Sequence, residues 1–321
     1  MEILKLKPVG KNYLWGGNRL NTEFHKNISM SPLAETWECS VHLDGPSYII
    51  NGDNKGMSLI DVLKEHPEYL GFKMNDKQFP ILVKFIDAKE KLSVQVHPTD
   101  VYARVNEHDN GKTEMWYIID AEPDAKLVYG FNQNMSPTLI RTAVKKGVLE
   151  RYLNFISVKK GDCVFVPAGV VHAIGKGILI AEIQESSNVT YRLYDYNRID
   201  KDGKKRELNV DKALNVIDMK DASNLLKKFK VTKYYPYVCV QSLVQCKYFN
   251  VEKIIIRKDF CFNVQDDSFQ VVVCIDGCAE ISSQDKEKHS VTFRKGDTMF
   301  LPANIGICTI RGDAEIIKIH C

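Results

Sequence analysis

Hydrophobic residues in this chain occur mostly in short runs that are interrupted by glycine, proline or charged positions. Residues 115–119 and 271–275 are two such apolar runs, and residues 93–97 (SVQVH) alternate polar and apolar positions. Short runs and alternation with period two are typical of β-strands. The pattern therefore predicts a mainly β protein built from antiparallel strands, with a few helical inserts.

Three segments depart from this pattern because their apolar residues recur at helical spacing. Each also begins with a residue that favours a helix start. The segments are residues 58–66 with Ser58 as the cap, residues 136–153 with Pro137 at the first helical position, and about 210–229 with Asp211 as a candidate cap and Lys227 and Lys228 near the end.

An internal repeat gives the strongest indication of domain organisation. Residues 160–168 (KGDCVFVPA) recur as residues 295–303 (KGDTMFLPA), and upstream of them residues 114–120 (EMWYIID) match residues 270–276 (QVVVCID). A strand, a Gly-Asp turn and a strand ending in Pro-Ala are thus built twice. We expect two related β-barrels, a first domain over residues 1–234 that includes the helical inserts and a second over residues 235–321.

Polar side chains gather on two candidate strands of the first domain. In a strand, Ser93, Gln95 and His97 point to one face while Val94 and Val96 point to the other. The same alternation places Lys112 and Glu114 on one face of the strand that follows.

A second histidine, His172, follows the repeated strand, in residues 167–172 (PAGVVH). Together with His97, Glu114 and the amide oxygen of Gln95 it forms a donor set that suits a borderline divalent ion such as zinc. Four such ligands leave room for water or a substrate oxygen, which is typical of a catalytic metal site.

The two repeats differ at these positions. Aligned on the Pro-Ala pair, His172 corresponds to Ile307, and aligned on the apolar strand, Glu114 corresponds to Gln270. The second domain is therefore predicted to be metal-free. Because the shared fold does not require the ligands, function is the simpler reason for their presence in the first domain.

These residues resemble the cupin superfamily and, more closely, the type I mannose-6-phosphate isomerase family in its short bacterial form. The ligand pattern of Gln95, His97, Glu114 and His172 is similar to that family's. So are residues 12–17 (NYLWGG), 34–38 (AETWE) and 191–198 (YRLYDYNR). The resemblance implies two cupin-type jelly-roll barrels. One departure is Asn188, where some members have a carboxylate.

The resemblance also implies the reaction, interconversion of mannose 6-phosphate and fructose 6-phosphate through an enediolate, with one zinc ion per chain or another divalent metal. A proton is moved between carbons 1 and 2, which needs an electrophile and a base. Glu182 is the expected base, because burial can raise the pKa of a carboxyl group. Lys112 is a competing proton carrier, Arg192 is a further catalytic residue, and Ser93, Lys112 and Arg192 are expected to bind the sugar phosphate.

Plainer interpretations of these residues stay open at this point. Lys112 could be an exposed strand residue, Glu182 could pair with Lys112 or Arg192, and Arg192 could pair with Asp195 or Glu185. The other histidines are interpreted as surface or packing residues: His25, His42, His66, His108, His289 and His320.

Two other functions compete with the isomerase. Two histidines and a carboxylate could hold ferrous iron in a cupin oxygenase, but the amide of Gln95 would take one of the positions that oxygen and substrate need. A non-catalytic sugar-phosphate sensor is compatible with Asn188, although the intact ligands, Lys112 and Arg192 favour an enzyme.

Composition adds limits on partners. Lys and Arg outnumber Asp and Glu by only 44 to 41, so there is no basic surplus for a nucleic acid. Charges within residues 1–8 and the lack of a long apolar run predict a cytoplasmic protein with no membrane partner. We expect a monomer or a weak dimer that binds a sugar phosphate.

Overall fold

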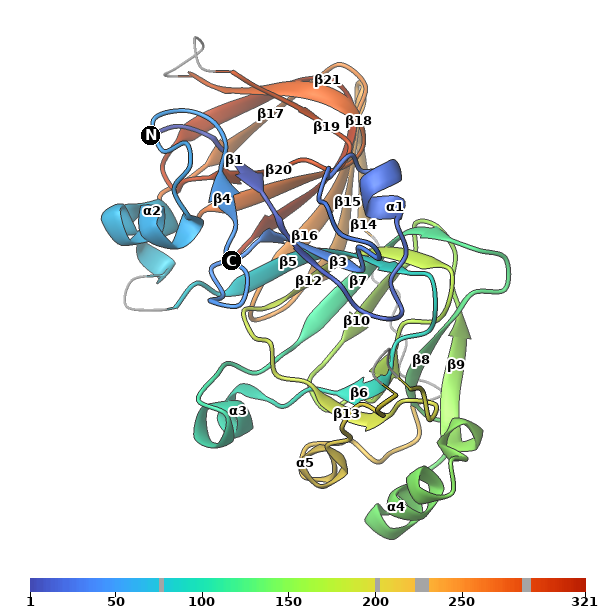
Figure 1. Ribbon diagram of the computed structural model, residues 1–321. Helices are drawn as coiled ribbons and strands as arrows, with labels where there is room; N and C mark the ends of the chain where they lie inside the picture. Colours follow the sequence, from blue (N-terminus) through green and yellow to red (C-terminus); the bar gives the residue numbers. More distant parts are fainter. Residues whose placement is uncertain (75–77, 200–202, 223–230, 285–289) are drawn as a thin grey trace.

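The computed structural model describes residues 1–74, 78–199, 203–222, 231–284 and 290–321. Strands make up most of its regular structure, and short helices lie at the margins (Figure 1). This arrangement confirms the predicted mainly β fold.

The first unit consists of two sheets that pack face to face. Trp116 and Ile180 of one sheet share a buried cluster with Leu127 and Tyr129 of the other. The six-stranded sheet has the order β10 (Cys163–Val166), β7 (Glu114–Ala121), β12 (Ile178–Glu185), β5 (Ile81–Ala88), β3 (Glu35–Cys39) and β2 (Val9–Lys11). The five-stranded sheet has the order β13 (Tyr191–Tyr194), β6 (Val94–Val96), β11 (His172–Ala173), β8 (Lys126–Phe131) and β9 (Leu153–Ser157).

The second unit is a ten-stranded sheet that curls around its own apolar cluster. Its order is β14 (Val231–Tyr235), β15 (Val238–Gln245), β16 (Asn250–Ile256), β21 (Gly306–His320), β18 (Gln270–Ser283), β20 (Thr298–Leu301), β1 (Leu4–Lys7) and β4 (Tyr48–Ile49). In addition, β17 (Asp259–Val264) pairs with β21 and β19 (Val291–Arg294) pairs with β18. Strands from the start of the chain thus complete this sheet, and the domain boundary expected after residue 234 stays a prediction.

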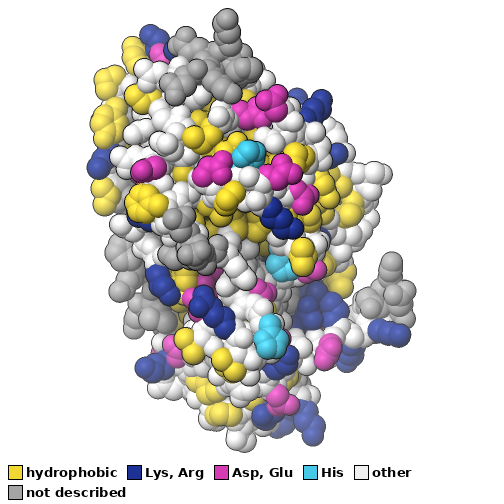
Figure 2. Space-filling model, turned by 90° about the vertical axis from the view of Figure 1, so that its left-hand side faces the viewer, with side chains coloured by type: hydrophobic (Ala, Val, Ile, Leu, Met, Phe, Trp, Pro, Cys, Tyr) yellow, Lys and Arg dark blue, Asp and Glu magenta, His cyan; other side chains and the backbone are white. Residues whose placement is uncertain are grey.

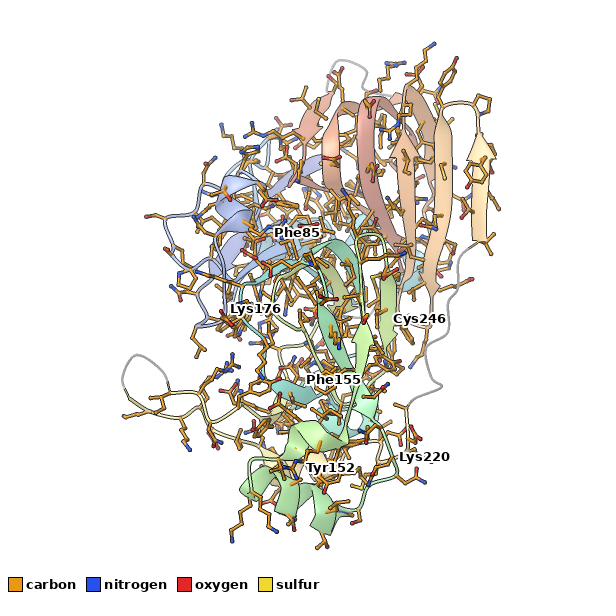
Figure 3. The ribbon with its side chains drawn as sticks, turned by 90° about the vertical axis from the view of Figure 1, so that its right-hand side faces the viewer. Phe85, Tyr152, Phe155, Lys176, Lys220 and Cys246 are labelled. Carbon is orange, nitrogen blue, oxygen red and sulfur yellow. The ribbon has the colours of Figure 1, made fainter. Side chains whose placement is uncertain are left out.

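A shared apolar layer joins the two units. Phe85, labelled in Figure 3, belongs to a buried cluster that also contains Ile183 of the first unit and Val271, Phe300 and Ile319 of the second. The aromatic rings of Phe300 and Phe269 stack with their centroids 5.1 Å apart. Because both units bury apolar side chains in this shared cluster, the layer holds the two units against each other.

The repeat is confirmed strand by strand. Val166 of β10 lies opposite Glu114 of β7, and Leu301 of β20 lies opposite Gln270 of β18. The turn before each second strand contains a glycine at positive φ, Gly161 at 88° and Gly296 at 96°, a conformation that glycine adopts without steric cost. The alignment of Glu114 with Gln270 therefore holds in space.

The helix predictions are partly confirmed. Helix α2 (Leu59–Glu65) follows the Ser58 cap as expected. Helix α4 (Pro137–Lys145) ends before Gly147, whose φ of 67° turns the chain, and a 3-10 helix, η3 (Leu149–Tyr152), completes the predicted segment. The remaining short elements are α1 (Arg19–Thr22), α3 (Asp100–Asn106), η1 (Pro67–Leu70) and η2 (Phe72–Met74).

Only the beginning of the third predicted helix is confirmed, and residues 215–222 are not helical. Helix α5 (Val210–Leu214) has Asn209 instead of Asp211 at its cap position and ends early. After it, the N–H of Asp218 donates to the carbonyl of Gly169, so tertiary contacts replace further helical turns. Lys227 and Lys228 lie outside the described residues.

On the face shown in Figure 2, basic and acidic side chains are interspersed over the surface. Among the described residues, no helix has the length and apolar character needed to cross a membrane.

Candidate metal centre

Two neighbouring strands bring the candidate ligands together. Gln95 of β6 and His172 of β11 are directly paired, so their side chains share one face. Val94 and Val96 point the other way into a buried cluster under helices α4 and α5. The predicted alternation of polar and apolar faces is confirmed, and Glu114 reaches the same place as the first residue of β7.

Both histidines are oriented by the backbone. The Nδ1 atom of His97 lies 2.9 Å from the carbonyl of Val189, and that of His172 lies 2.9 Å from the carbonyl of Val170. A carbonyl accepts a hydrogen bond, so Nδ1 carries the proton and the lone pair is left on Nε2. The two Nε2 atoms lie 3.1 Å apart. Burial lowers the pKa of both rings, that of His172 to about 4, which keeps them neutral.

The spacing of the donor atoms fits a single bound ion. His172 Nε2 lies 3.3 Å from Glu114 Oε1, and His97 Nε2 lies 3.5 Å from Glu114 Oε2. Ligands about 2.0–2.1 Å from a tetrahedral zinc would be roughly 3.3–3.4 Å apart. Both oxygens of Glu114 are buried without a well-oriented hydrogen-bond donor among the described residues. The amide of Gln95 lies 3.5 Å from His172 Nε2 and can present its oxygen there by a half turn.

Lys112 lies among these candidate ligands, as predicted, although it precedes strand β7 instead of sharing a strand face with Glu114. Its buried ammonium is 3.0 Å from Glu114 Oε2 and 3.0 Å from His97 Nε2. Burial raises the pKa of Glu114 to about 8, against the opposing charge of Lys112. The charge of Lys112 thus partly offsets the cost of burying the Glu114 carboxylate.

Glu182 is buried nearby, but its partners differ from those expected. Its Oε1 accepts a hydrogen bond from the Trp116 indole at 3.0 Å, and its Oε2 lies 3.3 Å from Lys84 Nζ. The alternative in which Glu182 pairs with Lys112 or Arg192 is thus wrong. Burial alone would raise the pKa of Glu182, but the charges of Lys84 and Lys112 outweigh it and lower the pKa to about 2. The raised pKa predicted from the sequence is wrong too.

Lys84 is the main residue that sequence reasoning missed. Its buried ammonium lies between Glu182 and Glu35, whose Oε2 is 3.7 Å away and accepts a hydrogen bond from the Trp37 indole. The signal was present as a lone lysine within the apolar run of residues 81–88 (ILVKFIDA).

Arg192 and Ser93 lie together at the other end of this face. Arg192 Nε is 3.4 Å from Ser93 Oγ, and Nη1 donates to the carbonyl of Glu207 at 2.9 Å. Asp195 is instead bonded by Arg198 and Arg206. The alternative in which Arg192 pairs with Asp195 or Glu185 is therefore wrong, since no described carboxylate lies within ion-pair distance of Arg192.

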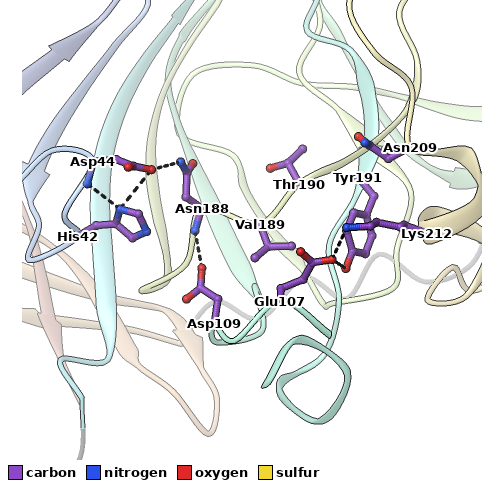
Figure 4. Close-up of a pocket in the computed structure, with 10 residues that line it drawn as sticks. All are labelled: His42, Asp44, Glu107, Asp109, Asn188, Val189, Thr190, Tyr191, Asn209 and Lys212. Carbon is purple, nitrogen blue, oxygen red and sulfur yellow. Dashed lines mark hydrogen bonds and ion pairs between the residues drawn. The ribbon is translucent and has the colours of Figure 1, made fainter. Parts of the chain in front are cut away.

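A cavity of about 340 Å³ adjoins the ligands, because Val189, which holds His97, also lines it (Figure 4). Here the Asn188 amide donates to Asp44 Oδ2 at 2.8 Å, and His42 Nδ1 lies 3.5 Å from the same oxygen. A carboxylate from another segment thus lies beside Asn188. His42, interpreted from sequence as a surface or packing residue, is part of this cavity wall.

Comparison with known proteins agrees with this site. The family described as phosphomannose isomerase type I, catalytic domain, matches residues 3–130, and the mannose-6-phosphate isomerase cupin domain matches residues 240–321. The chain is 38% identical to mannose-6-phosphate isomerase ManA of Bacillus subtilis, covering 99% of both chains. It is 36% identical to the mannose-6-phosphate isomerase of Streptococcus mutans, covering 99% of this chain and 98% of that one.

A solved structure extends the likeness to three dimensions. The crystal structure of the mannose 6-phosphate isomerase from Bacillus subtilis superimposes with a TM-score of 0.90 at 36% identity, over 100% of both chains. Sequence and fold thus agree along the whole length, and the chain belongs to the type I mannose-6-phosphate isomerase family.

Proposed function

We propose that this protein interconverts mannose 6-phosphate and fructose 6-phosphate with one zinc ion bound by Gln95, His97, Glu114 and His172. The observation that carries the proposal is the cluster of His97, Glu114 and His172 donor atoms at ligand spacing, in a chain that belongs to this family. The relatives named above favour the isomerase over an oxygenase or a sensor.

The bound ion would supply a positive charge toward the sugar oxygens on which negative charge develops. The protein residues prepare this place. The carbonyls of Val189 and Val170 fix the two imidazoles, and the walls around them are buried. Exclusion of water strengthens the electrostatic interactions at the reacting carbons.

Arg192 and Ser93 are assigned to binding of the sugar phosphate. The guanidinium of Arg192 has no carboxylate partner among the described residues, and a planar fork of donors suits phosphate or enediolate oxygens. Ser93 is two residues from Gln95 on the same strand face. This spacing would place the phosphate about 7 Å from the ligands, within reach of one hexose chain.

Two residues are candidates for the proton transfer between carbons 1 and 2. Glu182 is an ionised carboxylate, but its lowered pKa makes it a weaker base than the sequence led us to expect. Lys112 lies closer to the ligands, 3.0 Å from both Glu114 and His97. We therefore assign the proton transfer to Lys112 or Glu182 and Arg192 to the stabilisation of negative charge.

Purified protein reconstituted with zinc would be assayed for conversion of fructose 6-phosphate to mannose 6-phosphate, beside a chelator-treated sample and His97→Ala. We expect turnover that is lost in both controls. Turnover that survives chelation would contradict the metal's role, and bound zinc without turnover would favour the sensor. In heavy water, Lys112→Met and Glu182→Gln are compared for incorporation of deuterium at carbon 2 of mannose 6-phosphate, which the variant lacking the proton carrier should lose.

A further inference from the structure

A second cavity, of about 170 Å³, lies between the two units, since residues of both line it. Tyr117 and Ile119 of β7 and Ile275 of β18 form its base, and all three belong to the apolar layer that the units share. Trp116, the neighbour of Tyr117, faces the interior of the first unit, as Glu114 does. The cavity is therefore on the side of β7 that faces away from the metal centre.

Both units have a β-bulge at the edge of this cavity. In β7, Ile119 is an extra residue, because its neighbours Ile118 and Asp120 pair with consecutive residues of β12. In β18, Ile275 is the extra residue in the same way, and Asp276 follows it. A bulge interrupts the alternation of faces and re-aims a side chain. Both aspartates that follow the bulges line the cavity.

The Lys-Gly-Asp turns of the internal repeat reach the same cavity. In each unit the N–H of the turn glycine donates to the carbonyl of the residue before the bulge, at 2.8 Å in the first unit and 2.9 Å in the second. The lysines that begin these turns, Lys160 and Lys295, both line the cavity. Each unit thus contributes an isoleucine, an aspartate and a lysine from matching positions of the repeat.

Ion pairs within the protein account for four of the remaining charged groups around the cavity and one group behind it. Arg19 of α1 lies 2.6 Å from Asp120 and 2.7 Å from Glu23, so it holds both carboxylates. On the other side, Glu315 lies 2.8 Å from Lys253. The aspartate of the first unit therefore has a cationic partner within the protein.

Three lining charges have no opposite charge within ion-pair distance among the described residues: Lys160, Lys295 and Asp276. None of them is buried, so a ligand can reach them. The ammonium of Lys295 lies 4.7 Å from the centroid of the Phe24 ring, which attracts the charge without neutralising it. Asp276 is directly opposite Glu315 on β21, and like charges in such positions destabilise a sheet.

We propose that this cavity binds an acidic amino acid, with its two carboxylates at Lys160 and Lys295 and its ammonium at Asp276. Such a molecule carries two negative charges and one positive charge, which match the three unpaired charges one for one. Its short aliphatic chain would lie over Ile119 and Ile275. A phosphate would meet the lysines but leave Asp276 unpaired. The site is separate from the metal centre and does not depend on the proposed isomerase activity.

The test is isothermal titration of the zinc-loaded protein with L-glutamate, L-glutamine and glutarate. We expect a Kd for glutamate on the order of 1 mM. Glutamine lacks the second carboxylate and glutarate lacks the ammonium, so each should bind about threefold to tenfold more weakly.

Variants of the lining residues locate the binding. Lys295→Met should weaken glutamate binding by about threefold to tenfold, while isomerase turnover is unchanged. In Asp276→Asn the preference for glutamate over glutarate should disappear, because that preference comes from the ammonium. Lys159→Met removes an exposed lysine that does not line the cavity and should bind like the unaltered chain.

Four results would overturn the proposal. These are no binding of glutamate, equal binding of the three compounds, full binding by Lys295→Met, and a preference for glutamate over glutarate that Asp276→Asn retains. Carboxylates also bind zinc, so His97→Ala is titrated as well and should bind glutamate like the unaltered chain. Loss of binding in His97→Ala would locate the ligand at the metal centre and contradict the proposal too. If Lys295→Met does not fold, Lys160→Met, at an exposed position, replaces it with the same expected loss.

Discussion

The two units use the same strand register for different purposes. Glu114 and Gln270 occupy matching positions, yet the carboxylate of the first lies 3.3 and 3.5 Å from two histidines, and the amide oxygen of the second has no hydrogen-bond partner among the described residues. Ile307, aligned with His172, is 46% exposed and takes no part in the interior. The fold therefore tolerates either set of residues, which supports a functional reason for the candidate ligands of the first unit.

The ion pairs of the two units show which features the architecture itself requires. Lys84–Glu182 and Glu252–Lys318 have exchanged signs at matching positions. Opposite charges across neighbouring strands stabilise either arrangement. The environment differs, since Trp116 donates to Glu182 where the second unit has Val272. The first pair is consequently deeper, with side chains 6% and 4% exposed against 12% and 30%.

The largest effect on turnover is expected when Glu114 of the first unit is replaced by glutamine, the residue at the matching position of the second unit. Glu114→Gln removes the carboxylate ligand and should lower kcat by about 10²–10³-fold or more, because the charge that stabilises the developing oxyanion is lost. Bound zinc should fall in parallel. The reverse change, Gln270→Glu, serves as the control and should add no metal. A second bound zinc in Gln270→Glu would show that the position of Gln270 in the second unit is close to being a metal site.

The next prediction compares the two ion pairs. Lys84→Met leaves Glu182 and Glu35 buried without their cation and should destabilise the fold by about 3–5 kcal/mol. Lys318→Met leaves Glu252, which is partly exposed, and should cost about 1 kcal/mol or less. Urea unfolding measures both values. Equal losses of stability in the two variants would mean that the deeper burial of the Lys84–Glu182 pair does not raise the cost of removing its cation.

A smaller effect is expected at Arg192, which has no carboxylate within ion-pair distance among the described residues, whereas Lys318 of the second unit is paired with Glu252. Arg192→Lys keeps the charge but loses the planar fork, so we expect kcat/KM for fructose 6-phosphate to fall about 10- to 100-fold. Arg151→Lys, at an exposed position, is the matched control. An unchanged KM with lower kcat would assign Arg192 to the enediolate instead of the phosphate.

The repeat and the strand faces could be predicted from the sequence because both rest on local rules. Period-two alternation was enough to place Gln95 and His97 on one face, and the repeated turns aligned Glu114 with Gln270. Partners that are distant in sequence could not be found this way. Lys84 pairs with Glu35 across two strands, and Asp44 meets Asn188 over 144 positions.

Local rules also failed where tertiary contacts ended an element. The apolar pattern after Val210 has helical spacing, yet the helix ends at Leu214. The N–H of Asp218 then donates to the carbonyl of Gly169 instead of continuing the helix. The glycine that ends helix α4, Gly147, was a readable signal, because positive φ is common just beyond a helix.

The last prediction uses another pair of matching positions, Glu185 of β12 and Cys321, which follows β21. Glu185 accepts a hydrogen bond from the N–H of Thr113 at 2.7 Å and so anchors the segment that carries Lys112 and Glu114. Burial raises the pKa of Glu185 to about 8, with a contribution from the nearby Asp100 charge. Burial also raises the pKa of the Cys321 thiol.

A raised carboxyl pKa has a definite sign for stability. Between the unfolded value near 4.3 and the folded value of about 8, the folded protein keeps a proton on Glu185 that the unfolded chain has lost. The free energy of unfolding should therefore fall as pH rises through this window, by up to about 1.4 kcal/mol per pH unit from this group, and level off above it. Glu185→Gln keeps the acceptor for Thr113 but cannot ionise, so its urea unfolding between pH 5 and 9 should lose this slope. Cys321→Ser changes a group whose raised pKa keeps it neutral in the folded protein below pH 8 and should keep the slope. An identical pH dependence in Glu185→Gln would mean that Glu185 is ionised in the folded protein.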